Sequence, residues 1–315
     1  MDLIAKHTMN SSVSVVIPTF NRKELIFQAL DSVARQTRPP LEVIVVDDCS
    51  SDGTVDALSA ARFPFPVHVV SLATNQGPAA ARNAGILKAR GRYIAFLDSD
   101  DAWLPEKLER QVALLESLPG RDATVLYSQV RLQRRHEVLL RPVRAKATGE
   151  TIAEYVFVNG GYLDQNTIML PTAFARAVMY RADMRLHEDW DFYLRLEEQG
   201  AAFVMVDMPL GITYDNSTSG RASAARPTHS LALLEDWRPR ISERAYFGLR
   251  ARIAPQLRGH ASLRACRFIV DAYRNRAISL WMVLVLIGRL VHPDLRQIAY
   301  YIRGKLARNA TAEAR

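Results

Sequence analysis

Apolar and polar positions alternate in blocks over the first 130 residues of the chain. Four apolar runs have the length of a β-strand, at residues 13–17, 41–46, 67–71 and 92–97. Three further segments have helical character, at residues 25–33, 78–89 and 105–118. Strands that alternate with helices in this way are typical of a mostly parallel sheet with helices on both faces. The pattern therefore predicts an α/β fold.

The pattern changes in the second half of the chain. Residues 131–146 are basic and irregular, which predicts a hairpin or a mobile loop. Residues 188–199 form an amphipathic helical pattern. From residue 230 onward the pattern is helical throughout. We therefore expect an α/β domain over residues 1–220 and a helical region over residues 221–315.

Charge is unevenly divided between these two parts. The whole chain carries 41 Lys+Arg and 33 Asp+Glu, a formal net charge of +8. The helical region alone contains 18 Lys+Arg against 6 Asp+Glu. Such a basic segment is compatible with a solvated helical face, or with contact to anionic lipid, a phosphate-bearing substrate or nucleic acid. No aromatic and basic recognition motif accompanies it, so we expect no nucleic-acid partner.

Membrane contact and compartment depend on a few features. The longest apolar run, residues 280–287, is too short for the roughly 20 residues of a membrane-spanning helix. It predicts a buried helix, or a helix in a membrane interface, and the arginines that flank it are compatible with peripheral membrane contact. The two cysteines, Cys49 and Cys266, give neither a disulfide framework nor a zinc motif. We therefore expect a cytoplasmic protein that can be peripheral at the inner face of the cytoplasmic membrane.

Acidic side chains directly follow two of the predicted strands. Asp98-Ser99-Asp100-Asp101 comes after one strand, and Asp47-Asp48 comes after another. In open α/β sheets, ligands bind outside the carboxyl ends of the strands, so both clusters lie where a site is expected. Crowded carboxylates repel one another unless a cation or proton intervenes, and Mg²⁺ or Mn²⁺ is held by one or two carboxylates plus substrate phosphates. The first cluster is therefore a candidate metal site.

Some of the polar residues near these strand ends have a structural alternative, because Asp, Asn and Ser also cap helices. Asp101 is a candidate cap of the helix that follows it, as Asp52 and Ser51 are of theirs. Asn21 with Glu24 resembles a capping pair at the start of the first helix. The sequence leaves the capping and the ligand-binding interpretations open.

Four segments, in this order and spacing, resemble family 2 glycosyltransferases. They are SVVIPTFNR (residues 14–22), EVIVVDDCSSDGT (42–54), NQGPAAARNAGILKARGRYIAFLDSDDAWLP (75–105) and EDWDFYLRL (188–196). The resemblance covers about residues 12–215. It implies a GT-A fold, which is a Rossmann-like α/β architecture, and transfer with inversion from a nucleoside-diphosphate sugar. An isolated DxD would be a weak signal, whereas this ordered set is specific.

The resemblance also implies roles for individual residues. The nucleoside pocket would contain Pro18, Phe20 and Asp48, with Arg82 at a basic position near the nucleotide. Asp98 and Asp100 would form the DxD pair toward the donor and the metal, with Asp100 the more direct ligand of Mn²⁺ or Mg²⁺. Independently of the resemblance, a divalent ion suits a departing nucleoside diphosphate because it neutralises developing negative charge.

By the same resemblance, Asp189 is the general base that takes the proton of the acceptor hydroxyl. An inverting transfer needs one such positioned carboxylate and no covalent intermediate. Glu188 and Asp191 lie at the same helix start and are the alternatives, and negative side chains there also favour a helix N-terminus electrostatically. Arg221, or the segment at 217–225, is a candidate lid over the diphosphate.

Together these patterns predict an enzyme, a metal-dependent inverting glycosyltransferase. By the resemblance, the sugar would pass from a UDP- or dTDP-sugar to a hydroxyl of a cell-envelope or secreted glycan, which can be lipid-linked. Missing membrane spans and a missing glutamine–arginine–tryptophan motif favour single addition over processive synthesis. A nucleotidyltransferase would need a Gly-rich basic loop where this chain has Pro18-Thr19-Phe20-Asn21-Arg22. The alternative from another class is a catalytically silent, nucleotide-sugar-binding subunit of a glycan assembly complex.

Overall fold

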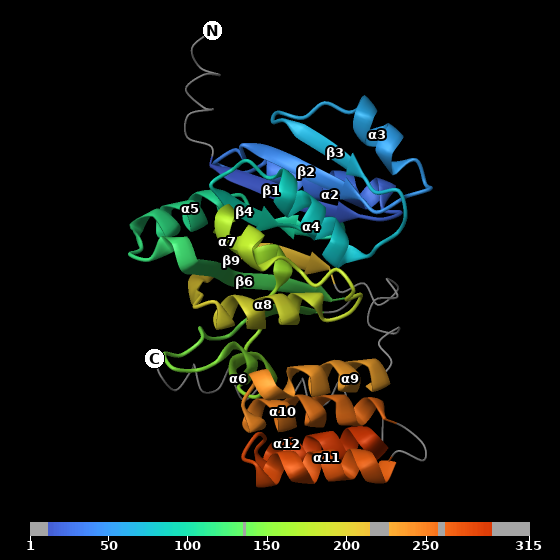
Figure 1. The fold of residues 1–315 in the computed structure, drawn as a ribbon, viewed down its shortest axis with the longest axis vertical. Coiled ribbons are helices and arrows are strands. Elements are labelled where there is room, and N and C mark those ends of the chain that lie inside the picture. Colours follow the sequence, from blue (N-terminus) through green and yellow to red (C-terminus); the bar gives the residue numbers. More distant parts are fainter. Residues whose placement is uncertain (1–11, 135–136, 215–226, 258–261, 292–315) are drawn as a thin grey trace. The chain divides into compact units, whose positions relative to one another are not determined.

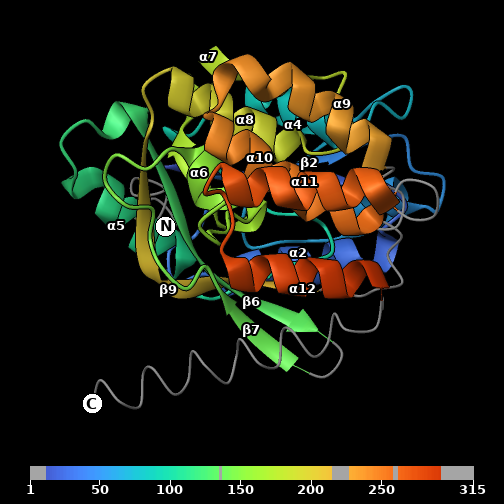
Figure 2. The ribbon, with the colours of Figure 1, turned by 90° about the horizontal axis from the view of Figure 1, so that it is seen from below.

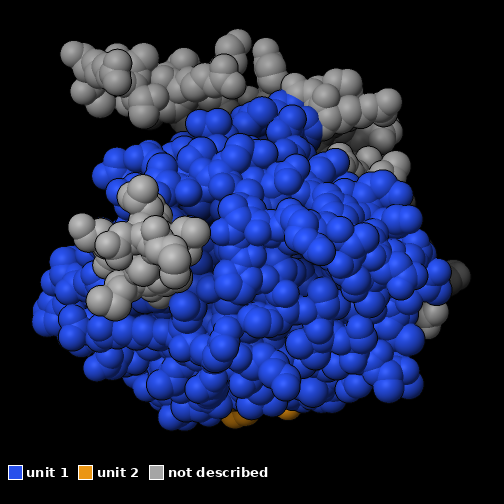
Figure 3. Space-filling view, turned by 90° about the horizontal axis from the view of Figure 1, so that it is seen from above, with its two compact units in different colours: residues 1–152, 161–219 blue, residues 153–160, 220–315 orange. Residues whose placement is uncertain are grey.

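The computed structural model describes residues 12–134, 137–214, 227–257 and 262–291 of the 315-residue chain. The chain forms two compact units, which Figure 3 colours separately. Unit 1 consists of residues 1–152 and 161–219, and unit 2 consists of residues 153–160 and 220–315. The sequence predicts a division at residue 220; unit 2 also takes the short segment 153–160.

Unit 1 is built on one mixed sheet, which has nine strands in the described part of the chain (Figure 1). The strands are β1 (Val13–Thr19), β2 (Glu42–Asp47), β3 (Val67–Ser71), β4 (Tyr93–Phe96), β5 (Ala102–Trp103), β6 (Thr124–Arg134), β7 (Glu137–Arg141), β8 (Met169–Pro171) and β9 (Ala202–Tyr214). Their order across the sheet is β3-β2-β1-β4-β8-β6-β9-β5, with β7 beside β6. The strands β3, β2, β1 and β4 are parallel, as are β6 and β9, whereas β8 runs antiparallel to both β4 and β6. The predicted α/β architecture with a mostly parallel sheet is confirmed.

Alternate side chains of β1 pack on opposite faces of the sheet, as the two-residue period of a strand requires. Val13, Val15 and Ile17 belong to a buried core with apolar residues of α2 (Lys23–Ala34) and α5 (Lys107–Ser117). Val16 faces the other way, toward α4 (Pro78–Lys88). There a Cβ on Gly85 would lie 2.3 Å from Val16 Cγ1, so only glycine lets α4 approach β1 this closely. Helices therefore cover both faces, which is why the central strands are apolar throughout.

The described part of unit 1 contains three further helices and a hairpin. The helices are α3 (Thr54–Ala60), α7 (Thr172–Val178) and α8 (Glu188–Glu198). The basic segment at 131–146 begins as a hairpin, because β6 and β7 pair from Val130 opposite Arg141 to Arg134 opposite Glu137. The hairpin alternative of the sequence prediction is therefore confirmed for that part of the segment.

The predicted capping pair of Asn21 and Glu24 is wrong. No side chain of the N-cap residue caps α2, and the carboxylate of Asp52 instead accepts the Lys23 amide at 3.0 Å. Asn21 Oδ1 accepts the Ser51 amide at 2.9 Å. These two contacts join the turn after β1 to the turn after β2. They also fix the first residue of α2.

The two capping interpretations of the aspartates have opposite outcomes. Asp101 does not cap α5, whose N-cap position is Glu106, and one of its carboxylate oxygens accepts the Tyr214 amide at 2.9 Å. Asp52 Oδ1 accepts the amide of Thr54, the first residue of α3, at 3.1 Å. Capping by Asp52 is therefore confirmed, and capping by Asp101 is wrong because that carboxylate is used at the end of β9.

Unit 2 is helical throughout its described residues, as the sequence predicts (Figure 2). It contains most of α6 (Ile152–Phe157), followed by α9 (Pro227–Trp237), α10 (Glu243–Ile253), α11 (Ser262–Arg274) and α12 (Leu280–Val291). The ring of Phe157 stacks on Trp237 with 6.3 Å between centroids. This contact holds the inserted segment against the first helix of the C-terminal part.

The apolar run at 280–287 forms the first two turns of α12. In the part of the chain that the structure describes, no helix is long and apolar enough to cross a membrane. Leu286 is buried, but Leu280, Trp281 and Leu284 are 59%, 51% and 59% exposed. The prediction of a buried helix is therefore wrong for this face of α12, which presents large apolar side chains to solvent.

Candidate active site

The residues predicted to bind the nucleoside lie at the carboxyl ends of β1 and β2. Pro18 is the last residue but one of β1, and Phe20, just beyond the strand, is 45% exposed. Asp48 directly follows β2, and its amide donates to the carbonyl of Thr19 at 2.8 Å. The fold therefore brings Phe20 and Asp48 together at adjacent strand ends.

The carboxylate of Asp48 holds the loop that leads into α4. Its Oδ1 accepts the Gln76 amide at 2.7 Å and its Oδ2 accepts the Gly77 amide at 2.8 Å. Gly77 has a φ of +92°, a left-handed conformation that glycine adopts without steric cost. A carboxylate oxygen has two lone pairs, so Asp48 can accept a further hydrogen bond at each oxygen.

Arg82 of α4 joins two of the other segments that the sequence singles out. Its Nη2 donates to Asp98 Oδ1 at 2.6 Å and its Nη1 donates to Glu188 Oε1 at 2.9 Å. The guanidinium is buried and lies over the ring of Tyr180, 5.7 Å from the centroid. Burial lowers the pKa of Arg82, but the charges of Asp98 and Glu188 outweigh burial and raise the pKa above its usual value. Arg82 therefore remains a fixed cation between two carboxylates.

Asp189 lies in the first turn of α8, next to Glu188. One of its oxygens accepts the Trp190 amide at 2.9 Å, and the other receives no hydrogen bond from the described residues. Burial, followed by the neighbouring Glu188 carboxylate, raises the pKa of Asp189 to about 7. A carboxylate with a raised pKa binds a proton more tightly than an ordinary aspartate, which suits a general base near neutral pH.

The two alternative bases have other partners. Glu188 is paired with Arg82. Asp191 is fully buried and accepts a hydrogen bond from Arg195 Nε at 2.7 Å. Arg195 also donates to two backbone carbonyls at the end of α7, so Asp191 takes part in the packing of α8. Of the three carboxylates, Asp189 has the geometry that best suits proton transfer.

The acidic run after β4 is held by Asn166, a residue that sequence reasoning missed. Asn166 Oδ1 accepts the Asp98 amide at 2.6 Å, and Nδ2 donates to Asp101 at 2.6 Å and to Asp164 at 2.8 Å. Because β8 runs antiparallel to β4, the residues before β8 lie beside those after β4. The polar segment 164–167, directly before an apolar run, is the signal in the sequence that points to this position.

The carboxylates around Asn166 crowd one another. Burial, followed by the charges of Asp164, Asp98 and Asp100, raises the pKa of Asp101 to about 9. Burial also raises the pKa of Asp164. Arg22 Nη2 lies 3.9 Å from Asp100 Oδ2. Acidic groups are therefore concentrated at this strand end, and the raised pKa of Asp101 favours its neutral, protonated form.

Asp98 and Asp100 fit a divalent cation by their chemistry. Hard cations bind carboxylate oxygens, and the crowding at Asp101 is the charge excess that a cation relieves. Among the described residues, no three His, Cys, Asp or Glu side chains converge on one point as a metal site. Magnesium sites commonly use one or two carboxylates and complete their shell with phosphates and water. The candidate lid at 217–225, with Arg221, lies outside the described residues.

Three comparisons identify what this chain is similar to. Residues 14–162 match the family described as Glycosyl transferase family 2. The amylovoran biosynthesis glycosyltransferase AmsB of Erwinia amylovora is 32% identical over 247 residues, which are 76% of this chain and 82% of AmsB. The structure of S. aureus TarS 1-349 in complex with UDP-GlcNAc has a TM-score of 0.62 at 20% identity, over 93% of this chain and 88% of that chain. The mannosyltransferase PcManGT from Pyrobaculum calidifontis, in complex with GDP-Man and Mn²⁺, has a TM-score of 0.58 at 18% identity, over 90% and 84%.

The fold is that of a glycosyltransferase of the GT-A class. The chain belongs to glycosyltransferase family 2.

Proposed function

We propose that the chain is an inverting, metal-dependent transferase that moves a sugar from a UDP- or dTDP-sugar to a hydroxyl of a cell-envelope or secreted glycan. The observation that carries this proposal is the pair of hydrogen bonds from buried Arg82 to Asp98 and to Glu188. These bonds support a single site in which the donor side and the base side are coupled. The amylovoran biosynthesis in the name of AmsB supports a polysaccharide as the acceptor.

In this proposal Pro18, Phe20 and Asp48 hold the nucleoside. The exposed ring of Phe20 offers a face for the base. The remaining lone pairs of Asp48 accept hydrogen bonds from the base or the ribose. The UDP-GlcNAc and GDP-Man of the two similar structures support a nucleoside-diphosphate sugar as the donor class.

Asp98 and Asp100 are the residues that would hold Mn²⁺ or Mg²⁺. Such an ion, when bound, supplies Lewis-acid neutralisation of the charge on a departing diphosphate. The Mn²⁺ of the Pyrobaculum mannosyltransferase supports this assignment. Arg82 holds Asp98 in place and contributes a second positive charge beside the acidic run.

Asp189 is the base in the proposed reaction. The acceptor oxygen forms a bond to the anomeric carbon while the bond from that carbon to the diphosphate oxygen breaks. The acceptor proton passes to the Asp189 oxygen that receives no hydrogen bond from the described residues. A single displacement of this kind inverts the anomeric centre without a covalent intermediate. The raised pKa of Asp189 favours its acceptance of the proton.

We further propose that the acceptor can be lipid-linked and that the enzyme is cytoplasmic, with unit 2 in peripheral contact with the inner face of the membrane. The exposed apolar residues of α12 and the arginines around them support that contact.

The test is an assay of nucleoside diphosphate release from UDP-, dTDP- and GDP-sugars, with and without Mn²⁺ and with glycan acceptor extracts. We expect release from a uridine or thymidine donor, dependent on the metal and on the acceptor. The matched control is Asp189→Asn, which should bind the donor and release nucleoside diphosphate far more slowly. Donor binding without release by the unaltered protein, with every donor and acceptor, would indicate the catalytically silent subunit instead.

A further inference from the structure

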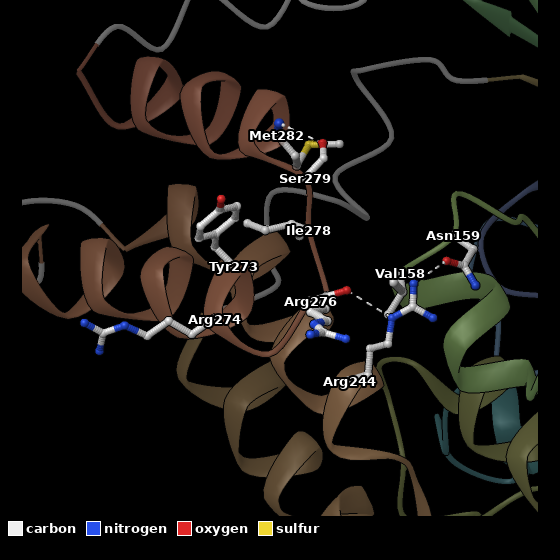
Figure 4. A pocket seen from close by; sticks show the side chains of 10 residues that line it. Val158, Asn159, Arg244, Tyr273, Arg274, Arg276, Ile278, Ser279 and Met282 are labelled. Carbon is white, nitrogen blue, oxygen red and sulfur yellow. Dashed lines mark hydrogen bonds between the residues drawn. The ribbon is translucent and has the colours of Figure 1, made fainter.

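Unit 2 contains a cavity of about 660 Å³ between α10, the end of α11 and the start of α12 (Figure 4). Its wall has a basic part, formed by Arg244 and Arg276, and an apolar part, formed by Tyr273, Ile278 and Met282. The lining residues all belong to unit 2, so the cavity is separate from the strand-end site of unit 1.

Hydrogen bonds fix the guanidinium of Arg244 at this cavity. Its Nε donates to the carbonyl of Arg276 at 3.1 Å, and its Nη2 donates to Asn159 Oδ1 at 3.1 Å. Glu154 Oε2 lies 4.0 Å from Nη1 and is the acidic group that faces this arginine. The exposed side chain of Arg276 forms no ion pair with a described residue. The two arginines therefore present a positive surface whose charge is only partly balanced.

The first turns of α12 extend the apolar part of the cavity onto the surface. Leu280, Leu284 and Ile287 recur at helical spacing and are exposed, with Trp281 beside them. Tyr273 of the neighbouring α11 is also exposed, and the two helices lie side by side (Figure 2). Large exposed apolar side chains flanked by arginines are typical of a helix in a membrane interface.

The charge around the exposed apolar residues of α11 and α12 indicates which kind of partner this face binds. Residues 262–291 contain five arginines and one acidic residue, Asp271. Two copies of such a face would repel each other across a symmetric interface, whereas an anionic lipid surface attracts it. A phospholipid carries a phosphate beside an apolar chain, which is the combination that the basic and apolar parts of the cavity match.

We propose that Arg244 and Arg276 bind the phosphate of an anionic phospholipid head group in this cavity, while α12 lies in the membrane interface. This proposal rests on the membrane contact proposed above and names its site. It does not depend on the sugar or the acceptor.

The experiment is sedimentation of the full chain with vesicles in the absence of donor and acceptor. Three vesicles are compared: phosphatidylcholine alone, phosphatidylcholine with phosphatidylglycerol, and phosphatidylcholine with oleate at the same surface charge. We expect binding to the phosphatidylglycerol vesicles, weaker binding to oleate vesicles and little to phosphatidylcholine. Equal binding to phosphatidylglycerol and oleate would mean attraction by surface charge alone and would overturn the head-group site.

Variants separate the cavity from general electrostatics. Arg276→Glu should raise the lipid concentration for half-binding by roughly tenfold or more, since each basic residue near an anionic surface matters strongly. Its control is Arg238→Glu, which makes the same charge change at a half-exposed arginine of unit 2 outside the cavity. Leu284→Glu tests the apolar face and should weaken binding, and Leu87→Glu, on α4 of unit 1, is its control.

The remaining outcomes also decide the proposal. If Arg276→Glu and Arg238→Glu bind vesicles equally, the cavity is not the lipid site. If inorganic phosphate protects the protein against heat as well as phosphatidylglycerol vesicles do, the cavity binds free phosphate and the lipid assignment is wrong. Because the vesicle assay contains no donor or acceptor, a failure there is distinct from a failure of the transferase assay.

Discussion

The guanidinium of Arg82 lies 2.6 Å from the carboxylate of Asp98, so a cation of α4 rests against the first carboxylate after β4. Both side chains are largely shielded from solvent, at 5% and 18% exposure. The second arm of the same guanidinium reaches Glu188 at the start of α8. A buried charge pair is costly to break, because the remaining charge is left without its partner. Arg82 therefore joins the acidic run after β4 directly to the start of α8.

We expect Arg82→Lys to reduce transfer by about 100-fold while the protein stays folded. Lysine keeps the charge, but its single ammonium cannot make the fork that contacts Asp98 and Glu188 together, and small misplacements of reacting groups are costly. Steady-state kinetics of nucleoside diphosphate release measures the effect. Arg82→Met should in addition lower the free energy of unfolding by about 3–5 kcal/mol, because it removes the cation that lies between the largely shielded carboxylates of Asp98 and Glu188. Arg110→Lys, in an exposed pair with Glu106, is the control and should change neither quantity appreciably.

Asp189→Asn should lower the rate of transfer by roughly 10²–10⁴-fold, the usual contribution of a general base, and leave donor binding intact. Asparagine preserves the shape of the side chain and cannot accept the acceptor proton. Isothermal calorimetry with the donor and single-turnover kinetics separate the two effects. Asp191→Asn should instead lower the stability of the protein, because it removes the charge of the buried carboxylate that pairs with Arg195, and it should affect the rate of transfer less. Transfer by Asp189→Asn at the unaltered rate would show that another residue is the general base.

The pH dependence of transfer should have an acidic limb near neutrality. Burial and the Glu188 carboxylate raise the pKa of Asp189 to about 7, and the base acts only when it is deprotonated, so the rate should rise with pH through that value. A cation bound with the donor lowers the pKa of Asp189. The acidic limb of kcat, which reports the enzyme with donor bound, should therefore lie at lower pH than the limb of kcat/KM, which reports the free enzyme. An acidic limb of kcat/KM near pH 4 would instead mean that the base has the pKa of an ordinary aspartate, which contradicts the raised pKa of Asp189.

The same shift predicts a pH-dependent gain in stability for Asp189→Asn. A carboxyl group whose pKa is raised by folding contributes stability below its unfolded pKa of about 3.9, and this contribution is lost as the pH rises through the folded pKa. The neutral asparagine does not lose it. Urea unfolding should therefore show Asp189→Asn gaining stability relative to the unaltered protein between pH 5 and pH 8. A constant difference across that range would contradict the shift.

Much of the sheet could be predicted because its signals are local. Each of β1 to β4 is a short apolar run bounded by polar residues, and parallel strands carry their carboxyl ends to one edge. This is why Asp48 and Asp98 could be placed at the same edge of the sheet from their positions alone. The hydrogen bond from Arg82 to Glu188 spans 106 positions in the sequence, and no local pattern encodes it.

The role of Asn166 and the exposed face of α12 were missed for a related reason. The importance of Asn166 depends on the antiparallel direction of β8, which is a property of the sheet as a whole. The apolar run of α12 is compatible with a core helix or an exposed one, and the packing of α11 and of the turn at Ala254–Gln256 against it decides which side chains are covered. Sequence periodicity gives the face of a helix but not what lies opposite that face.

Asp100→Ala should abolish metal-dependent binding of the donor. The reason is that Asp100 is one of the two carboxylates that would hold the cation, and the methyl group offers it no oxygen. Calorimetric titration of the donor with Mn²⁺, with Mg²⁺ and with EDTA measures the loss. Asp56→Ala, which removes an acidic residue from the first turn of α3, is the matched control. Donor affinity in Asp100→Ala that still responds to Mn²⁺ would assign the metal to other ligands.

Asn166→Leu should damage both stability and donor binding, which would make Asn166 a positioning residue for the acidic run. Leucine has a similar volume, but it leaves the Asp98 amide without its acceptor and Asp101 Oδ2 without its donor, whereas Asp164 keeps the backbone amide of residue 166. At about 1–3 kcal/mol for each unsatisfied group, the free energy of unfolding should fall by roughly 3 kcal/mol or more. Thr167→Val is the control, because it removes only the hydrogen bond to the Asp164 carbonyl. It should cost about 1 kcal/mol and leave Mn²⁺-dependent donor binding unchanged. Donor binding in Asn166→Leu as tight as in Thr167→Val, measured where both are folded, would reduce Asn166 to a structural role, since only the first variant releases the Asp98 backbone.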